Sequence, residues 1–307
     1  MKVVITYKNA DLDCVASAYA YSEYLNKKGE NTNYFISGVV QNEVEVVCNM
    51  FGIELTSGVK SINGEPVIVV DTNTFSSIDF VNPEQIIEII DHHPRSTDVF
   101  ENATIDIEQI GAVCTMITEK YKKDNISISR ESAILLYYGI ISNTVNLNSK
   151  VTTPRDIEMC NWLKEQCTEI DDNLIAKIFE EKSKFDIRDL RRMMEVEEKF
   201  VLGDEELIIG QLEIINAENF LKQYKSNIDS VINDVRNQYG VSLVFLNIID
   251  ILSGYHIIYS PYRDTISFLE EKYQSQFDDD RFVENRIVLR KEIKQYLRDT
   301  LKYPKAK

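Results

Sequence analysis

The sequence predicts an α/β protein, with a parallel sheet carrying helices on both faces and a smaller α/β domain after it. Short β-branched runs alternate with helical stretches along the first half of the chain, a pattern typical of a parallel sheet with right-handed crossovers. Acidic residues follow directly after several of the apolar runs. The 307 residues, at about 150 per domain, suggest two domains.

The first domain, residues 1–185, starts with a β-branched run and an apolar helix that ends at Lys27, Lys28 and Gly29, a usual helix stop. Thr153 precedes Pro154 and predicts an N-cap for a later helix. Strands are expected at 2–6, 32–38, 65–73 and 84–91, and helices at 13–29, 42–52, 112–124, 129–144 and 152–167.

The second domain, residues 186–307, follows a highly charged stretch at 175–200 that predicts a helical linker. Strands are expected at 207–215, 242–252 and 254–260, and helices at 217–240 and 265–273. Residues 287–301 predict either a strand leading into a helix or a helix throughout. The run Asp278–Asp280 is expected to be a solvated turn, and His256, within a strand pattern, a structural residue.

Composition excludes several classes of protein. A net charge of −16 argues against binding to duplex nucleic acid, which needs a basic surface. No stretch reaches the ~18 apolar residues of a membrane span, and the start of the chain is too acidic for a signal peptide. The five cysteines are scattered and odd in number, which suits reduced thiols in a cytoplasmic protein.

Acids and imidazoles gather after the predicted strands. Asp11 and Asp13 follow the first strand, Asp71 ends the third, and Asp91, His92 and His93 close the fourth. In parallel α/β sheets, ligands bind outside the carboxyl ends of the strands. We therefore expect these residues, which come from segments about eighty positions apart, to form one site.

Such a site predicts a divalent cation, because packed carboxylates repel one another unless a cation holds them. Oxygen ligands suit Mg²⁺ and Mn²⁺, and Mn²⁺ also accepts imidazole. Two ions sharing a carboxylate can generate a hydroxide that attacks phosphorus, which predicts phosphoester or phosphoanhydride hydrolysis. Taken alone, an Asp-X-Asp sequence is more often a turn or cap, and a His-His pair a surface or core feature.

Four segments in this order resemble the motifs of the DHH phosphoesterase superfamily: "YKNADLD", "VVDTN", "DHHP" and "GIISNTVNLNSKVTTPRD". In the second domain, "SLVFLNIIDIL" and "IVLRKEIKQYL" resemble the DHHA2 domain of manganese-dependent (family II) inorganic pyrophosphatases and cytosolic exopolyphosphatases. The similarity is concentrated at the motifs. It implies a phosphohydrolase acting at a cleft between the domains on pyrophosphate, short polyphosphate or a related small phosphate compound.

The resemblance also implies a role for each site residue. Asp71 would bridge two metal ions, and Asp91 would orient the imidazoles. His93 would face the substrate or its leaving group. Arg290 and Lys291 would clamp the terminal phosphate when the domains close. The implied metal ligands are Asp11, Asp13, Asp71, His92 and Asn143, and the implied cofactor is Mn²⁺, with Mg²⁺ or Co²⁺ as alternatives, as one ion or two.

The chain departs from the family pattern at several positions: Tyr7 replaces a histidine, Asn143 an aspartate and Leu289 a serine. Near the domain junction, Lys199 also stands one position off, with Glu198 in the place where pyrophosphatases have a lysine. The first two changes weaken the metal ligands and leave two hypotheses open. One is an enzyme acting on a small anionic phosphate substrate. The other is a catalytically impaired relative that binds a phosphate or nucleotide in a regulatory role. Pyrophosphatases of this kind also imply a homodimer formed through the first domain.

Overall fold

The computed structural model describes residues 1–55, 61–183, 190–193 and 200–302. It divides into two compact units, Met1–Glu181 and Lys182–Lys307. The predicted domain boundary between residues 185 and 186 lies outside the described residues, as do 184–189 and 194–199 of the predicted linker. Each unit is described by itself.

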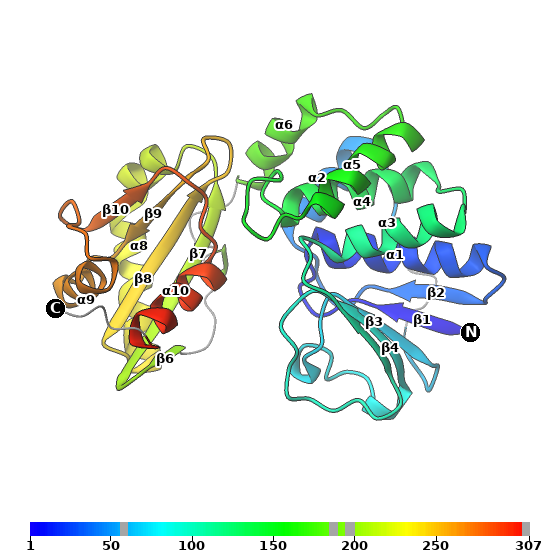
Figure 1. Ribbon diagram of the computed structural model, residues 1–307, viewed down its shortest axis with the longest axis horizontal. Coiled ribbons are helices and arrows are strands. Elements are labelled where there is room, and N and C mark those ends of the chain that lie inside the picture. Colours follow the sequence, from blue (N-terminus) through cyan, green and yellow to red (C-terminus); the bar gives the residue numbers. More distant parts are fainter. Residues whose placement is uncertain (56–60, 184–189, 194–199, 303–307) are drawn as a thin grey trace. The chain divides into compact units, whose positions relative to one another are not determined.

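Within the described residues, five parallel strands form the sheet of the N-terminal unit, in the order β2-β1-β3-β4-β5 (Figure 1). The strands are β1 (Lys2–Ile5), β2 (Thr32–Phe35), β3 (Val67–Val70), β4 (Ile86–Asp91) and β5 (Thr104–Ile107). The helices are α1 (Leu12–Lys27), α2 (Asn42–Phe51), α3 (Val113–Asp124), α4 (Arg130–Asn143), α5 (Pro154–Gln166) and α6 (Asn173–Lys182), with the 3₁₀ turns η1 (Phe75–Ser77) and η2 (Pro83–Gln85).

The two faces of this sheet are covered differently. Helix α1 packs on β1, β2 and β3, and α3 and α4 pack on α1. On the opposite face, Val3, Ile5 and Val69 join a core with Ile78, which follows η1, and with Phe100, which lies between β4 and β5. The predicted parallel sheet flanked by helices is therefore confirmed, with 3₁₀ turns covering one face.

The C-terminal unit contains a mixed sheet in the order β10-β9-β8-β7-β6. Strands β7 and β8 are parallel, and the other neighbours are antiparallel. Helix α8 packs against one face, and α9 and α10 against the other. The elements are β6 (Phe200–Leu202), β7 (Glu205–Ile214), β8 (Leu243–Asp250), β9 (Tyr255–Tyr259), β10 (Arg281–Glu284), α7 (Leu190–Met193), α8 (Ala217–Tyr239), α9 (Arg263–Tyr273) and α10 (Arg290–Lys302).

The longer predicted elements are confirmed, including the helix stop at Gly52, whose φ is +63°. The predicted cap Thr153 accepts from the N–H of Asp156, and Asp156 bonds back to it. Residues 287–289 do not form a strand, so the last segment is a helix, α10. Strands β5, β6 and β10 were not predicted from the sequence; they are edge strands of three or four residues. None of the helices in the described ranges has the length and apolar character to span a membrane.

Asp156 joins α5 to the loop before α3. Its carboxylate is fully buried. It accepts hydrogen bonds from the N–H of Gly111 at 3.1 Å, from Thr153 and from the Thr115 hydroxyl at 2.6 Å. A Cβ at Gly111 would lie 2.7 Å from Asp156 Oδ2, so only glycine allows this close approach. The carboxylate thereby fixes residues 110–112, which border the site described below.

We predict that Asp156→Ala lowers the free energy of unfolding by about 3 kcal/mol, because buried donors lose their acceptor. Urea unfolding would measure the change. Glu158→Ala is the control, because Glu158 lies on α5 as Asp156 does. This change removes an exposed ion pair with Lys122 of α3 and costs less than about 1 kcal/mol. Equal losses in the two variants would contradict this role of Asp156.

Candidate metal centre

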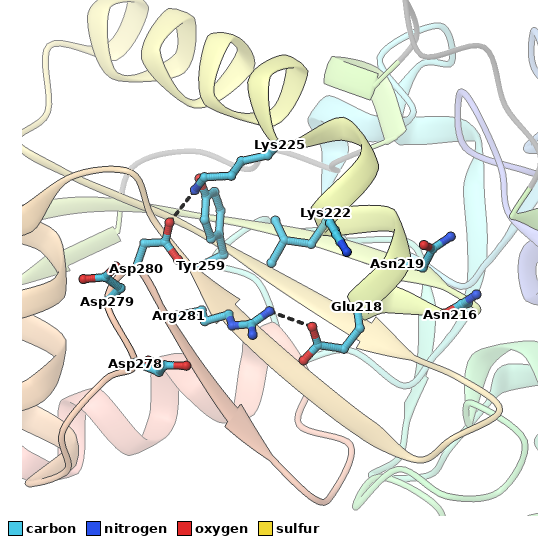
Figure 2. A pocket seen from close by; sticks show the side chains of 11 residues that line it. Asn216, Glu218, Asn219, Lys222, Lys225, Tyr259, Asp278, Asp279, Asp280 and Arg281 are labelled. Carbon is cyan, nitrogen blue, oxygen red and sulfur yellow. Dashed lines mark hydrogen bonds and ion pairs between the residues drawn. The ribbon is translucent and has the colours of Figure 1, made fainter.

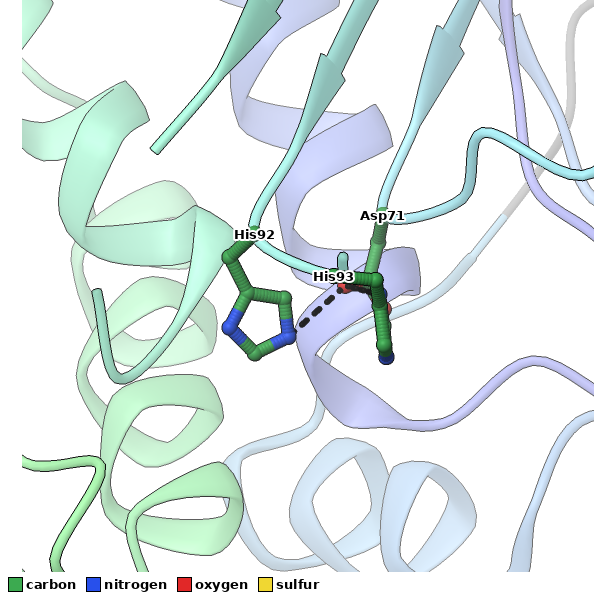
Figure 3. A group of neighbouring side chains, drawn as sticks. All are labelled: Asp71, His92 and His93. Atoms are coloured by element: carbon green, nitrogen blue, oxygen red, sulfur yellow. Dashed lines mark ion pairs between the residues drawn. The ribbon is translucent and has the colours of Figure 1, made fainter. Parts of the chain in front are cut away.

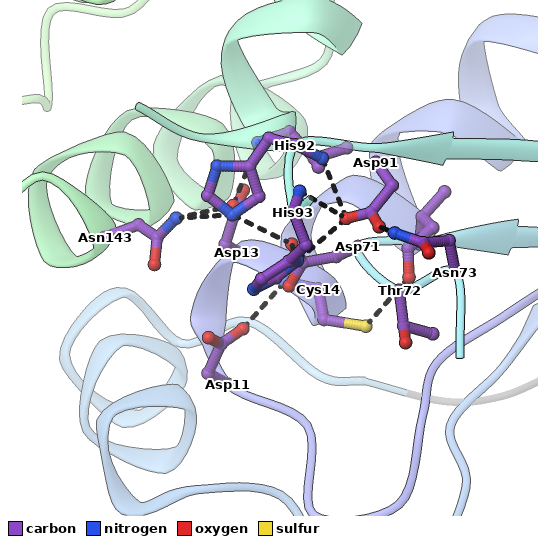
Figure 4. Close-up of polar contacts among 12 residues, drawn as sticks. Asp11, Asp13, Cys14, Asp71, Thr72, Asn73, Asp91, His92, His93 and Asn143 are labelled. Atoms are coloured by element: carbon purple, nitrogen blue, oxygen red, sulfur yellow. Dashed lines mark hydrogen bonds and ion pairs between the residues drawn. The ribbon is translucent and has the colours of Figure 1, made fainter. Parts of the chain in front are cut away.

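The carboxyl ends of the parallel strands bring together the residues that the sequence singled out. Asp11 lies between β1 and α1, and Asp71 follows β3 directly. Asp91 is the last residue of β4, and His92 and His93 come next. Figure 4 shows their side chains, with that of Asp13, around one small region at this edge of the sheet.

Asp71 is held in a left-handed backbone conformation, with φ +63°, at the end of β3. Its N–H donates to the carbonyl of Ile90 on β4 at 2.8 Å. The side chain is only 2% exposed, and its Oδ1 atom has no hydrogen-bond partner. This oxygen lies 3.4 Å from Nε2 of His92 and 3.9 Å from Nδ1 of His93 (Figure 3).

The tautomer of His92 follows from its second contact. Its Nδ1 atom lies 2.9 Å from the carbonyl oxygen of Ile110, which can only accept. Nδ1 therefore carries the hydrogen, and Nε2 presents a lone pair toward Asp71. A carboxylate oxygen and an imidazole lone pair that face each other at 3.4 Å in a buried place attract a cation. The donor set thus fits a divalent ion.

Asp91 orients the ring of His93 through a hydrogen bond from its Nδ1 atom. It is fully buried and accepts from the N–H groups of His92 at 2.7 Å and His93 at 3.2 Å, and from Nδ1 of His93 at 2.8 Å. Burial alone would raise the pKa of Asp91, but the bonds from His93 and Asn73 outweigh it and lower that pKa. The ring of His92 is oriented by Ile110 instead, so the predicted role of Asp91 applies to one imidazole ring.

Asp13, in the first turn of α1, lies at the N-terminus of α3. Its carboxylate accepts from the N–H groups of Val113 at 2.9 Å and Cys114 at 2.7 Å, where helix N-termini favour negative charge. Even so, burial and then the charge of Asp11 raise the pKa of Asp13 to about 7. The pKa of Asp71 is also raised, by burial first and then by Asp13 and Asp11. A bound cation would relieve this repulsion.

Asp11 is the N-cap of α1, because its Oδ1 accepts from the N–H of Cys14 at 2.9 Å. Its own N–H donates to the hydroxyl of Tyr7 at 3.4 Å. Burial, followed by the charges of Asp11 and Asp71, raises the pKa of Tyr7 well above its usual value. Tyr7 therefore lies beside the cluster as a neutral phenol.

Asn143 turns its amide nitrogen toward the cluster. Nδ2 lies 3.0 Å from Oδ2 of Asp13, 2.9 Å from the carbonyl of Gly111 and 3.3 Å from Nε2 of His92. The carbonyl and the carboxylate only accept, which fixes the NH₂ group on this side. In this orientation Asn143 crosslinks Asp13 to the loop before α3, and its oxygen points elsewhere.

Asn73 is a site residue that the sequence analysis did not single out. Its side chain donates to Asp91 and to the carbonyl of Pro94 at 3.2 Å, and accepts from the N–H of Ser96 at 2.6 Å. It therefore holds the Asp91 carboxylate and the segment after His93 together. The signal available in the sequence was its place two residues after Asp71, in the quoted segment "VVDTN".

Arg290 and Lys291 are the first two residues of α10 in the C-terminal unit. Their role as a phosphate clamp stays a prediction.

The same unit contains a cavity of about 600 Å³ beside the N-terminal half of α8 (Figure 2). Its bases are largely neutralised, since Arg281 pairs with Glu218 at 2.6 Å and Lys225 with Asp280. The predicted turn Asp278–Asp280 lines this cavity.

The fold and the cluster together define an α/β protein with a candidate divalent-cation centre at the strand ends. Residues 2–140 match the model of the DHH family, N-terminal domain. The manganese-dependent inorganic pyrophosphatase of Bacillus subtilis is 26% identical over 259 residues, covering 82% of this chain and 83% of that protein. A probable manganese-dependent inorganic pyrophosphatase of Clostridium acetobutylicum is 28% identical over 251 residues, covering 80% of each chain.

A solved structure agrees with the fold. The putative family II inorganic pyrophosphatase of Methanococcus jannaschii superposes with a TM-score of 0.76, covering 97% of this chain and 99% of that one at 24% identity. The resemblance that the motifs indicated is thus confirmed for the DHH domain and for the architecture of both units.

We predict that Asp71→Asn raises the melting temperature of the metal-free protein, because it removes one charge from a group of mutually repelling carboxylates. The same change should abolish stabilisation by Mn²⁺. For the wild type, that stabilisation is about 2.7 kcal/mol at a free ion concentration 100-fold above the Kd. Thermal unfolding with chelator and with Mn²⁺ measures both effects.

Asp234→Asn, on the exposed surface of α8, is the control and should behave as the wild type does. An unchanged response of Asp71→Asn to Mn²⁺ would place the ion elsewhere.

Proposed function

We propose that this protein hydrolyses a phosphoanhydride, with pyrophosphate as the first candidate and short polyphosphate as the second, and that Mn²⁺ is its cofactor. The relatives named above are manganese-dependent pyrophosphatases or probable ones. The observation that carries the proposal is the buried Oδ1 of Asp71 facing the lone pair of His92, an arrangement that suits a cation with both oxygen and nitrogen ligands.

Asp11, Asp13, Asp71 and His92 would hold the metal in this proposal. A bound divalent ion supplies Lewis acidity, which neutralises phosphate charge and acidifies a water molecule. Asp71 would be the shared ligand if two ions bind. Asn143 could join them only with its oxygen, which requires the amide to rotate away from the carbonyl of Gly111.

His93 would donate a proton in this proposal. Its Nδ1–H is held by Asp91, so Nε2 faces away from that carboxylate, and the side chain is 51% exposed. A neighbouring buried carboxylate stabilises the imidazolium form. In this mechanism His93 holds a proton at Nε2 for the leaving phosphate oxygen, and Asp91 keeps the ring in place.

Arg290 and Lys291 would bind the terminal phosphate oxygens. A guanidinium fork and an ammonium point charge suit that task. Both residues belong to the first turn of a 13-residue helix, where backbone N–H groups also favour an anion.

We further propose that the protein is a homodimer and that it is cytoplasmic. The five described cysteines are all unpaired and buried, which suits a reducing compartment.

A second candidate function is the binding of a phosphate or nucleotide without turnover. The orientation of Asn143 favours it, because an amide NH₂ beside His92 and Asp13 competes with a cation for the same lone pairs. Calorimetry of nucleotide and phosphate ligands, combined with an assay for turnover, separates the two functions. Binding without product release would favour the second.

We predict that the protein releases phosphate from pyrophosphate when Mn²⁺ is added after removal of bound metal. Asp71→Asn should lower the rate by more than about a hundredfold, since even outer partners of metal ligands contribute 10–100-fold. A panel of pyrophosphate, tripolyphosphate and a phosphomonoester, each with Mn²⁺, Mg²⁺ or Co²⁺, measures substrate and metal preference. Asp234→Asn is again the control, and no release from any pair would reject hydrolysis.

We also predict that Tyr7→His combined with Asn143→Asp raises the affinity for Mn²⁺ by about tenfold, equivalent to about 1.4 kcal/mol. The aspartate adds a negative charge beside Asp13 and His92, and the histidine replaces a neutral phenol beside Asp11. Calorimetric titration of the metal-free protein gives the affinity and the number of ions bound. An unchanged affinity would mean that positions 7 and 143 do not adjoin the ion.

A further inference from the structure

Helix α10 starts without an acceptor side chain at its N-cap position. The residue before it is Leu289, whose side chain has no hydrogen-bond acceptor, whereas good N-caps are Ser, Thr, Asp or Asn. The N–H of Leu289 donates to Oε2 of Glu292 in the first turn, at 2.9 Å. The N–H of Arg290 instead donates to Oε1 of Gln211, at 2.6 Å. Gln211 lies on β7, 79 residues earlier in the chain. The sheet thus supplies the acceptor that the segment before the helix lacks.

Gln211 belongs to a buried polar row that crosses the sheet. Asn247 is its partner in the register of β7 and β8, and is fully buried. Nδ2 of Asn247 donates to the carbonyl of Val288 at 2.7 Å and lies 3.5 Å from Oε1 of Gln211. Oδ1 of Asn247 faces Nδ1 of His256 at 2.7 Å. His256 is buried in β9, consistent with its predicted structural role.

This row contacts the backbone on both sides of Leu289. Asn247 holds the carbonyl of Val288, and Gln211 holds the N–H of Arg290. Phe245 and Ile293 belong to the neighbouring apolar core, so apolar side chains at positions 211 and 247 would face apolar neighbours. Burying amides costs free energy unless their hydrogen bonds are made. This cost is offset by the hydrogen bonds from Asn247 to the carbonyl of Val288 and from the N–H of Arg290 to Gln211. The same two bonds hold the backbone at the first turn of α10.

We propose that Gln211 and Asn247 are positioning residues that fix the first turn of α10, so that Arg290 and Lys291 are preorganised to bind phosphate. The inference rests on the proposed function for the part played by those two bases. It predicts that the polar row affects substrate affinity more than the rate of the bound substrate, since a displaced clamp weakens binding without touching the residues around Asp71.

The test is Gln211→Met, which keeps the length of the side chain and removes the acceptor for Arg290. We expect KM for pyrophosphate to rise about fivefold, the equivalent of one hydrogen bond, with kcat changed less than about twofold. The calorimetric affinity for pyrophosphate, measured with Ca²⁺ in place of Mn²⁺ to slow turnover, should fall by the same factor. Hydrogen exchange should speed up over residues 287–293 and stay unchanged in α8.

A double variant tests the cause. In Gln211→Glu combined with Glu213→Gln, position 211 keeps an acceptor for Arg290, and the contact between Gln211 Nε2 and Glu213 Oε1, now 2.9 Å, is kept with donor and acceptor exchanged. This variant should restore KM and the slow exchange. Gln295→Met, on the exposed side of the same helix, is the matched control and should leave both unchanged.

Three results would overturn the inference: an unchanged affinity in Gln211→Met, faster exchange throughout the C-terminal unit, or failure of the double variant to restore binding. Failure of the proposed function is distinguishable, because a wild type without turnover still reports affinity and exchange. Weaker binding and local exchange in Gln211→Met would then support the positioning role on an anion site that does not hydrolyse its ligand.

Discussion

The N-terminal unit depends on one unfavourable juxtaposition, the buried oxygen of Asp71 facing the lone pair of His92 at 3.4 Å. Two acceptors that face each other repel unless a cation or a proton lies between them, and burial prevents water from screening them. The chain could avoid the conflict by rotating either side chain, but both are fixed. His92 is held by the carbonyl of Ile110, and Asp71 by a left-handed backbone tied to β4. The surrounding fold therefore maintains a place for positive charge.

Support for this arrangement comes from residues that touch no ligand. Asp156 fixes the loop that contains Ile110 and Gly111, and Asn73 fixes Asp91 and the segment that follows His93. Through Asp156, α5 supports the loop that orients the ring of His92. Through Asn73, the loop after β3 supports Asp91, which orients the ring of His93. Metal ligands held in this way lose little conformational entropy on binding, so stability given up in the metal-free protein is recovered as affinity.

The sequence predicted the part of the site that follows from topology. Asp71, Asp91 and His92 come directly after apolar strands, and parallel strands end at one edge of a sheet. The acceptor for His92 could not be predicted, because Ile110 contributes a backbone carbonyl that any residue would supply. The direction of the Asn143 amide depends on Gly111, 32 residues away. Edge strands such as β5 and β10 are too short to show periodicity and form only because a longer neighbour offers hydrogen bonds.

Because the net charge is −16, binding of an anion must depend on positive groups close to the binding site. The long-range field repels phosphate, but charges farther away than the Debye length, about 8 Å at physiological ionic strength, are screened. Binding then depends on positive groups at contact distance, and on how little must be rearranged to reach the ligand. In the proposed function, a cation held by Asp71 and His92 would be one such group. The first turn of α10, with two bases and a backbone contacted by Gln211, would be the other. In both units, buried polar atoms hold charged groups in place. This constraint explains why Gln211 and Asn247 lie on an otherwise apolar face of the C-terminal sheet, where packing alone does not require amides.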